Sequence, residues 1–171
     1  MSLVILEANI DLSYKIATEI FNGMYEKVTG KSLSVKSEDD GVSDLIVLGS
    51  DSVNDFLMTE VLEGRLKSLG IRYGTDSYAI KSYEKDGRKV LILAGGRLRS
   101  TLYAIYGYFE KFLNCGYFWD GDVIPKSDEI PLTGIDINEE PRFFYRGLRY
   151  FAHRGLKRFQ AEHWGFADWQ R

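Results

Sequence analysis

The fold is decided by residues 89–122, KVLILAGGRLRSTLYAIYGYFEKFLNCGYFWDGD. This stretch begins with a continuous apolar run, residues 90–94, whose length suits one buried strand. Gly95 and Gly96 interrupt the run, and an amphipathic helical pattern follows at once. We predict that this strand, a tight turn and the helix laid back over the sheet form the central element of the core.

The predicted helix has one apolar face. Its members recur at helical spacing and are Leu98, Leu102, Ile105, Tyr106, Phe109, Phe112 and Leu113. Asn114 and Gly116 supply a stop, because both residue types tolerate the left-handed conformation that ends helices. The apolar triplet at residues 117–119 is predicted to be a short strand that returns to the same core.

The rest of the chain up to residue 122 gives an alternation of strands and helices. We predict strands at 4–6, 33–36 and 45–48, a helix from 12 to 28 that stops at Gly30, and a second helix at 53–62 whose apolar side includes Leu62. Asp86 and Gly87 favour a hairpin that joins a strand at 77–83 to the central strand. This order predicts an α/β fold, in which a mixed sheet is covered by helices in two layers.

Composition excludes some classes of function. The net charge is −3, with 22 basic and 25 acidic residues, so charge gives no case for nucleic acid or an anionic membrane as a partner. No apolar run approaches the ~20 residues needed to cross a bilayer. The single cysteine, Cys115, cannot form an internal disulfide and is predicted to be a packing residue. The sequence fits a soluble protein, either cytoplasmic or secreted with its signal peptide removed.

The character of the chain changes after Trp119. All three prolines, Pro125, Pro131 and Pro141, fall in residues 123–141, and we predict a linker there. Residues 1–122 are then one α/β domain, and residues 142–171 begin a second domain. Because residues 142–171 are rich in aromatic side chains that a finished surface rarely exposes, we expect the chain to be a fragment of a longer polypeptide.

Three groups of residues invite a chemical interpretation. The Gly95-Gly96 turn lacks the lysine of a phosphate loop and the three glycines of a dinucleotide site, so we predict a packing turn and no cofactor. Asp120 and Asp122 could be paired carboxylates of a glycosidase, but two acids around one glycine are more typical of a turn. His153 and His163 match no zinc spacing, so we predict no metal.

A basic cluster lies among the aromatic residues near the end of the chain, at Arg142, Arg146, Arg149, Arg154 and Arg158. Arginine beside aromatic rings could bind single-stranded nucleic acid, but the acidic balance of the chain disfavours this hypothesis. The same combination is typical of sugar sites, where rings stack on pyranose faces and guanidinium groups hold hydroxyls.

Three motifs together resemble a known kind of domain. They are GGRxRxxLYAxYxxxE at 95–110, GYFWxGDxIP at 116–125 and EPRFFYRGL at 140–148. They resemble the N-terminal accessory domain of β-hexosaminidases of glycoside hydrolase family 20, α-glucuronidases of families 67 and 115, and α-N-acetylglucosaminidases of family 89. The end of the chain, 163–171, is similar to the tryptophan-rich start of the family 89 barrel, so that family is the closest resemblance.

The resemblance implies a role for each part of the chain. The small α/β domain would precede a catalytic (β/α)8 barrel. Residues 143–148 would belong to the first strand of that barrel, and residues 142–171 would be its truncated start. The catalytic carboxylates would lie on later strands, so we expect this fragment to be inactive although its parent is a glycoside hydrolase. Arg146 would contact the sugar or pair with a barrel carboxylate. The partners implied are the barrel of the same full-length chain and its carbohydrate substrate. The alternative is a stand-alone glycan- or protein-binding module that uses the aromatic tail.

Overall fold

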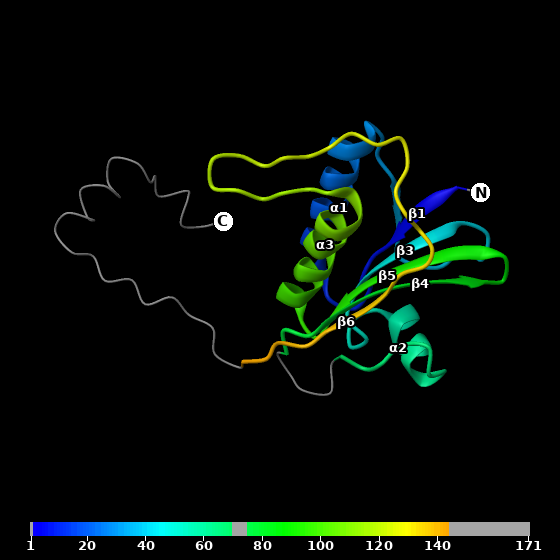
Figure 1. Ribbon diagram of the computed structural model, residues 1–171. Coiled ribbons are helices and arrows are strands. Elements are labelled where there is room, and N and C mark those ends of the chain that lie inside the picture. Colours follow the sequence, from blue (N-terminus) through cyan, green and yellow to red (C-terminus); the bar gives the residue numbers. More distant parts are fainter. Residues whose placement is uncertain (1, 70–74, 144–171) are drawn as a thin grey trace.

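The computed structural model describes residues 2–69 and 75–143, and Figure 1 shows their arrangement. The described chain contains a six-stranded sheet in the order β2-β1-β3-β5-β4-β6. The strands are β1 (Leu3–Leu6), β2 (Ser34–Lys36), β3 (Asp44–Gly49), β4 (Tyr78–Lys85), β5 (Arg88–Gly95) and β6 (Asp136–Glu139). The helices are α1 (Lys15–Thr29), α2 (Asp55–Leu62) and α3 (Leu98–Leu113), with a 3-10 turn at Leu12–Tyr14 before α1.

The sheet is mixed, as predicted. Strands β2, β1, β3 and β5 are parallel, whereas β4 pairs antiparallel with β5 and β6 pairs antiparallel with β4. Asp86 and Gly87 connect β4 to β5, and both have positive φ, 52° and 76°. Two successive residues with positive φ are what a type I′ hairpin turn requires, so the predicted hairpin is confirmed.

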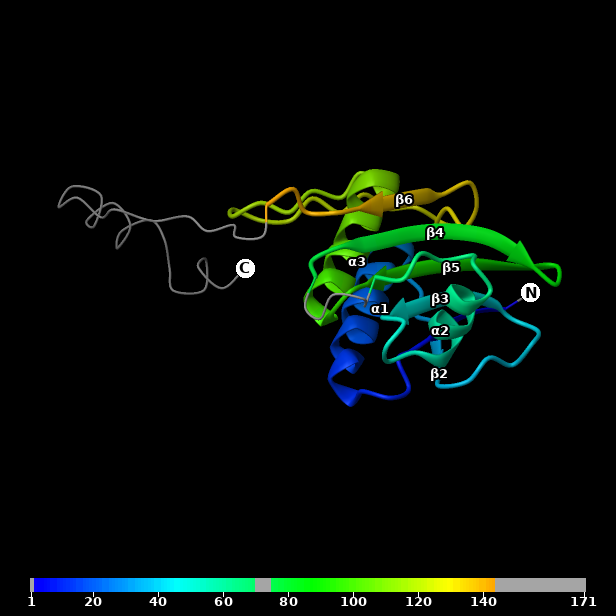
Figure 2. The same cartoon turned by 90° about the horizontal axis from the view of Figure 1, so that it is seen from below.

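Two apolar clusters, one on each face of the sheet, make up most of the core. Helices α1 and α3 lie on one face of the sheet, while the shorter α2 lies on the other (Figures 1 and 2). Phe21 of α1 meets Phe109 of α3 with ring centroids 5.3 Å apart, and both side chains are fully buried. Leu57 of α2 and Leu66 fill the opposite face above β3 and β5. The predicted α/β class is therefore confirmed.

The apolar faces of two helices differ from the prediction. On α3, Tyr106 is 37% exposed, and Tyr108 is fully buried instead. The Tyr108 hydroxyl donates a hydrogen bond to the carbonyl oxygen of Pro131 at 2.5 Å, which satisfies its one polar group inside the core. On α2, Leu62 is 81% exposed, because the helix ends there and the chain turns away at Glu63.

Residues 117–119 do not form the predicted core strand. Asn114 takes the left-handed conformation at the end of α3 (φ 54°), and the chain then closes a loop through a single bridge between Gly116 and Val123. Phe118 and Trp119 lie inside that loop and are 55% and 69% exposed. The prediction was wrong because aromatic content alone does not distinguish a core strand from an apolar loop.

The proline-containing segment, predicted as a linker, contributes to the sheet. Ile130 and Ile135 are buried, and β6 adds to the free edge of β4 with the register Tyr78↔Glu139 to Lys81↔Asp136. Beyond β6, residues 144–171 lie outside the described part of the chain, and so does the predicted barrel strand. Within the described part, no helix is long and apolar enough to cross a membrane.

Candidate functional site

Open α/β sheets usually bind ligands in a crevice at the carboxyl ends of their strands. The crevice forms between two neighbouring strands whose connections to the next strand leave in opposite directions. Here those strands are β1, which leads through α1 to β2, and β3, which leads through α2 to β4. The protein fills this crevice with its own side chain. Asn54 is buried and donates hydrogen bonds from Nδ2 to the carbonyl oxygens of Glu7 (3.1 Å) and Leu48 (3.0 Å).

The Gly95-Gly96 turn between β5 and α3 lets the helix approach the sheet closely. A Cβ on Gly95 would lie 2.2 Å from the amide nitrogen of Thr101, and one on Gly96 would lie 2.6 Å from the carbonyl oxygen of Leu69. Neither position has room for a side chain, because backbone atoms occupy the space. The prediction that the two glycines let the helix pack closely on the sheet is therefore confirmed.

The two arginines at the start of α3 are paired with a carboxylate of the same chain. Arg97 donates from Nε to the Asp76 carboxylate at 2.7 Å, and Arg99 donates from Nη2 to the same carboxylate at 3.0 Å. Burial raises the pKa of Asp76, but the two arginines outweigh it and hold this pKa below its ordinary value. The two guanidinium groups at the start of α3 thus share one carboxylate of the same chain.

Asp120 and Asp122 lie on the exposed loop that follows α3. Between them Gly121 has φ 138°, and its amide donates to the carbonyl oxygen of Phe118 at 3.2 Å. This is the turn that their spacing around one glycine predicted.

The other predicted candidates lie at or beyond the end of the described chain. Arg142 is exposed, and Arg146, Arg149, Arg154, Arg158, His153 and His163 are outside the described residues. Within residues 2–69 and 75–143, no three His, Cys, Asp or Glu side chains are grouped closely enough to hold a metal ion.

Residues 116–123, which we call the aromatic loop, expose three large apolar side chains, those of Phe118, Trp119 and Val123. Gly116 and Val123 exchange backbone hydrogen bonds of 2.9 and 2.8 Å, which close the loop. A Cβ on Gly116 would lie 2.5 Å from the Phe118 ring, so only glycine lets that ring pack over the backbone. Figures 1 and 2 show the loop projecting on the same side as the orange end of the described chain.

One aromatic contact fixes the aromatic loop to α3. The Tyr117 and Tyr106 rings meet edge to face, with centroids 4.8 Å apart and planes at 84°. Burial raises the pKa of Tyr117, and its hydroxyl is enclosed without a hydrogen-bond partner among the described residues. The loop is therefore held in place, while Phe118 and Trp119 remain open to contact.

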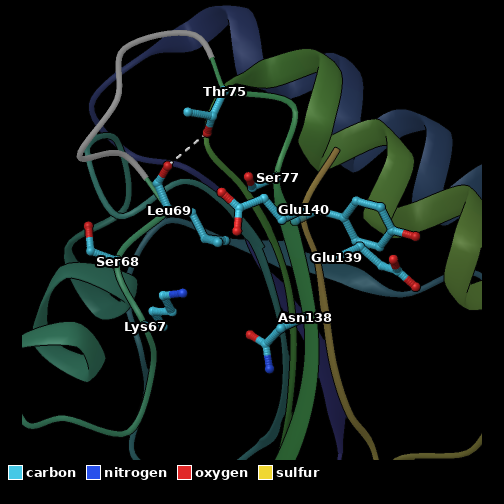
Figure 3. A pocket seen from close by; sticks show the side chains of 9 residues that line it. Lys67, Ser68, Leu69, Thr75, Ser77, Asn138, Glu139 and Glu140 are labelled. Atoms are coloured by element: carbon cyan, nitrogen blue, oxygen red, sulfur yellow. Dashed lines mark hydrogen bonds between the residues drawn. The ribbon is translucent and has the colours of Figure 1, made fainter. Parts of the chain in front are cut away.

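The second candidate site is a hollow of about 340 Å³ at the edge of the sheet, shown in Figure 3. Its lining comes from three separate segments, residues 67–69, 75–78 and 138–140. The side chains that supply polar groups are Lys67, Ser68, Thr75, Ser77, Asn138, Glu139 and Glu140. Sequence analysis missed this site, because pairing of β4 with β6 brings together residues about 60 positions apart and no local motif marks them.

These features define a class of protein, a small α/β domain whose usual ligand crevice is closed and whose surface carries an apolar loop. Among solved structures, the chain is similar to part of a family GH115 4-O-methyl-α-glucuronidase with specificity for decorated arabinogalactans. The TM-score is 0.50 at 11% identity, over 81% of this chain and 17% of that chain, and at this identity the likeness shows the fold alone. No family model and no curated protein matches the chain.

Proposed function

We propose that this chain is the non-catalytic accessory domain of a glycoside hydrolase and that it supports the (β/α)8 barrel that cleaves the glycosidic bond. The observation that carries the proposal is the shared fold with part of a family GH115 glucuronidase, of whose chain this domain covers 17%. The three motifs between residues 95 and 148 resemble the same kind of domain, and they support the proposal independently of the fold.

The carboxyl groups of the described chain also favour a non-catalytic role. Glycoside hydrolysis needs a carboxylic acid whose pKa is raised, so that it carries a proton to the leaving group. Among the described residues, every carboxyl group with a shifted pKa is shifted downward, and these groups are Asp11, Asp39, Asp40, Glu60 and Asp76. Each is ionised at neutral pH and cannot act as that acid.

The aromatic loop is the proposed contact with the barrel. Phe118 and Trp119 are exposed although their loop is closed and anchored, so binding would cost little ordering of the backbone. The loop projects on the side from which the chain continues past Phe143. An apolar patch in this position suits burial against the domain that follows.

The resemblance assigns finer roles that we include in the proposal. Arg146 would contact the terminal sugar in the assembled enzyme, and residues 143–148 would belong to the first barrel strand. Family 115 has the additional support of the shared fold, whereas family 89 rests on residues 163–171 of the sequence. The alternative, a stand-alone glycan- or protein-binding module, uses the same exposed aromatic residues without a barrel.

An activity assay tests the non-catalytic role. The pure 171-residue chain should hydrolyse none of the nitrophenyl glycosides of β-N-acetylglucosamine, α-N-acetylglucosamine and α-glucuronic acid. Steady turnover of any of them above a heat-killed control would overturn the proposal.

A pair of variants tests the docking role. Phe118→Ser with Trp119→Ser should leave the Tm of the 171-residue chain nearly unchanged, because both side chains are already exposed. In the full-length polypeptide the same change should lower the Tm of the barrel. Leu62→Ser is the control, since Leu62 is even more open to solvent but lies on α2, across the sheet. Equal Tm shifts for the two variants in the full-length polypeptide would contradict docking through the aromatic loop.

A further inference from the structure

The hollow in Figure 3 lies beside the second helical layer, which is short. Helix α2 has eight residues, and Leu69, which follows it in the chain, packs on the second apolar cluster. Strand β6 adds a further strand at the edge of the sheet. The hollow lies between residues 67–69, the start of β4 and the end of β6.

The polar groups in this hollow are available. The side chains of Lys67, Ser77 and Glu140 have no hydrogen-bond or ion-pair partner among the described residues. Figure 3 draws Lys67 on one wall and Asn138 on the other, with Glu140 near Ser77. Donors and acceptors thus converge on one space from different directions, as in sites that fix the orientation of a small polar ligand.

The base of the hollow is held by the chain itself. Thr75 donates a hydrogen bond from Oγ1 to the carbonyl oxygen of Leu69 at 3.0 Å. On the other side, Lys111 of α3 pairs with Glu139 at 2.9 Å, which fixes the end of β6. Leu69 and Tyr78 add apolar surface to the lining.

We propose that this hollow is a carbohydrate subsite that takes a neutral pyranose ring. Its volume of about 340 Å³ lies at the small end of the range for ligand pockets, which suits one or two sugar rings. Sugar hydroxyls can donate to Glu140 and to the oxygen of Asn138, and they can accept from Lys67 and Ser77. The C–H face of the ring has the Leu69 side chain as its apolar neighbour.

The charges of the lining favour a neutral sugar over an acidic one. Lys111 balances Glu139, so the remaining charges are those of Lys67 and Glu140, one of each sign. A uronate would gain the attraction of Lys67, but it would also face the carboxylate of Glu140. The inference does not depend on docking to a barrel, and it holds for the domain alone.

Saturation-transfer NMR and ¹⁵N-edited titration of the 171-residue chain test the subsite. The probes are methyl β-D-glucopyranoside, methyl β-D-galactopyranoside and methyl β-D-xylopyranoside, with methyl β-D-glucuronide as the acidic counterpart of the first. At least one neutral glycoside should bind with a Kd on the order of millimolar, as expected for a ligand of this size. Amide shifts should centre on residues 67–69, 75–78 and 138–140.

Variants decide whether the hollow is responsible. Asn138→Leu, at an exposed position of β6, should weaken binding at least fivefold, and Glu140→Gln should weaken it less because the amide still accepts a hydrogen bond. Thr133→Val, exposed and outside the lining, is the control and should change nothing. The inference is overturned if no neutral glycoside binds, if glycerol gives the same shifts, if Asn138→Leu binds normally, or if the glucuronide binds more tightly than the glucoside.

Discussion

Gly96 shows how one missing side chain positions an entire helix. A Cβ at this position would collide with Thr75 and Leu69, so only glycine lets the chain turn directly from β5 into α3. Gly23, in the middle of α1, has the opposite surroundings, since nothing lies within 4 Å of the position a Cβ would take. One glycine is therefore required by packing, and the other is not.

The two glycines make a matched test. We expect Gly96→Ala to destabilise the protein by about 1–3 kcal/mol through overpacking. Gly23→Ala should stabilise it by about 0.5–1 kcal/mol, because alanine is the better helix former. Urea unfolding followed by circular dichroism measures both. If Gly96→Ala is neutral, the turn has room that the structure does not show.

Glu60 is a buried carboxylate with three donors around it. Arg65 Nε lies 2.5 Å from Oε2, Lys85 Nζ lies 2.6 Å from Oε1, and the Tyr83 hydroxyl also donates to Oε2. Burial alone would raise the pKa of Glu60. The hydrogen bonds from Arg65, Lys85 and Tyr83 lower this pKa by more than burial raises it, so it lies below its ordinary value of 4.5. This network ties α2 to β4.

The lowered pKa of Glu60 gives the protein an acid-sensitive contribution to stability. Because the unfolded chain binds this proton more readily, the contribution is complete above pH 4.5 and is lost as the pH falls toward the folded pKa. Glu60→Gln should cost about 2 kcal/mol at pH 7 and flatten the stability profile below pH 5. Urea titrations between pH 3 and 7 measure this, with exposed Glu26→Gln as the control. A variant profile parallel to that of the parent would contradict the assignment.

At the scale of elements, α3 shows what its sequence could and could not predict. The existence of the helix, its glycine-bounded start and its stop at Asn114 follow from local rules of turn and cap chemistry. Local rules do not predict which of Tyr106 and Tyr108 is buried in the core. Both are aromatic, and the deciding factor is the carbonyl oxygen of Pro131, which comes from a segment 23 residues further along the chain.

Helix α3 also offers a stability test on one element. Phe109→Asp should destabilise the protein by more than about 3 kcal/mol, because a charge would enter the core without a partner. Tyr103→Asp places the same charge at an exposed position of the same helix and should change stability by less than about 1 kcal/mol. Thermal melts compare the two. Similar losses for both variants would mean that α3 does not present Phe109 to the core.

Strand β6 was missed for a different reason. Its sequence, DINE, has three polar residues out of four and no alternating pattern long enough to indicate a strand. It becomes a strand because β4 has a free edge at that position. Long-range pairing of this kind is not encoded locally. The same holds for the hollow, whose lining depends on that pairing.

At the scale of the whole molecule, the sheet should not be uniformly stable. Strand β5 lies between β3 and β4 and is covered on both faces, whereas β6 has one neighbour and mostly exposed side chains. Amides of Leu91 and Leu93 should exchange only on global unfolding, and those of β6 should exchange faster through local opening. Hydrogen exchange read by NMR tests this. Equal protection would show that β6 is part of the same cooperative unit as β5.

The direction of β6 has a mechanical consequence. Since β6 runs antiparallel to β4, it runs parallel to β1 and β5 and ends at the carboxyl edge of the sheet, whereas β1 begins at the opposite edge. A force that pulls the two ends of the described chain apart therefore acts along the strands. The hydrogen bonds of β1 and β6 lie across the direction of this force, so the force shears all of them at the same time. A domain connected in this way transmits tension between whatever precedes and follows it, rather than peeling open one bond at a time.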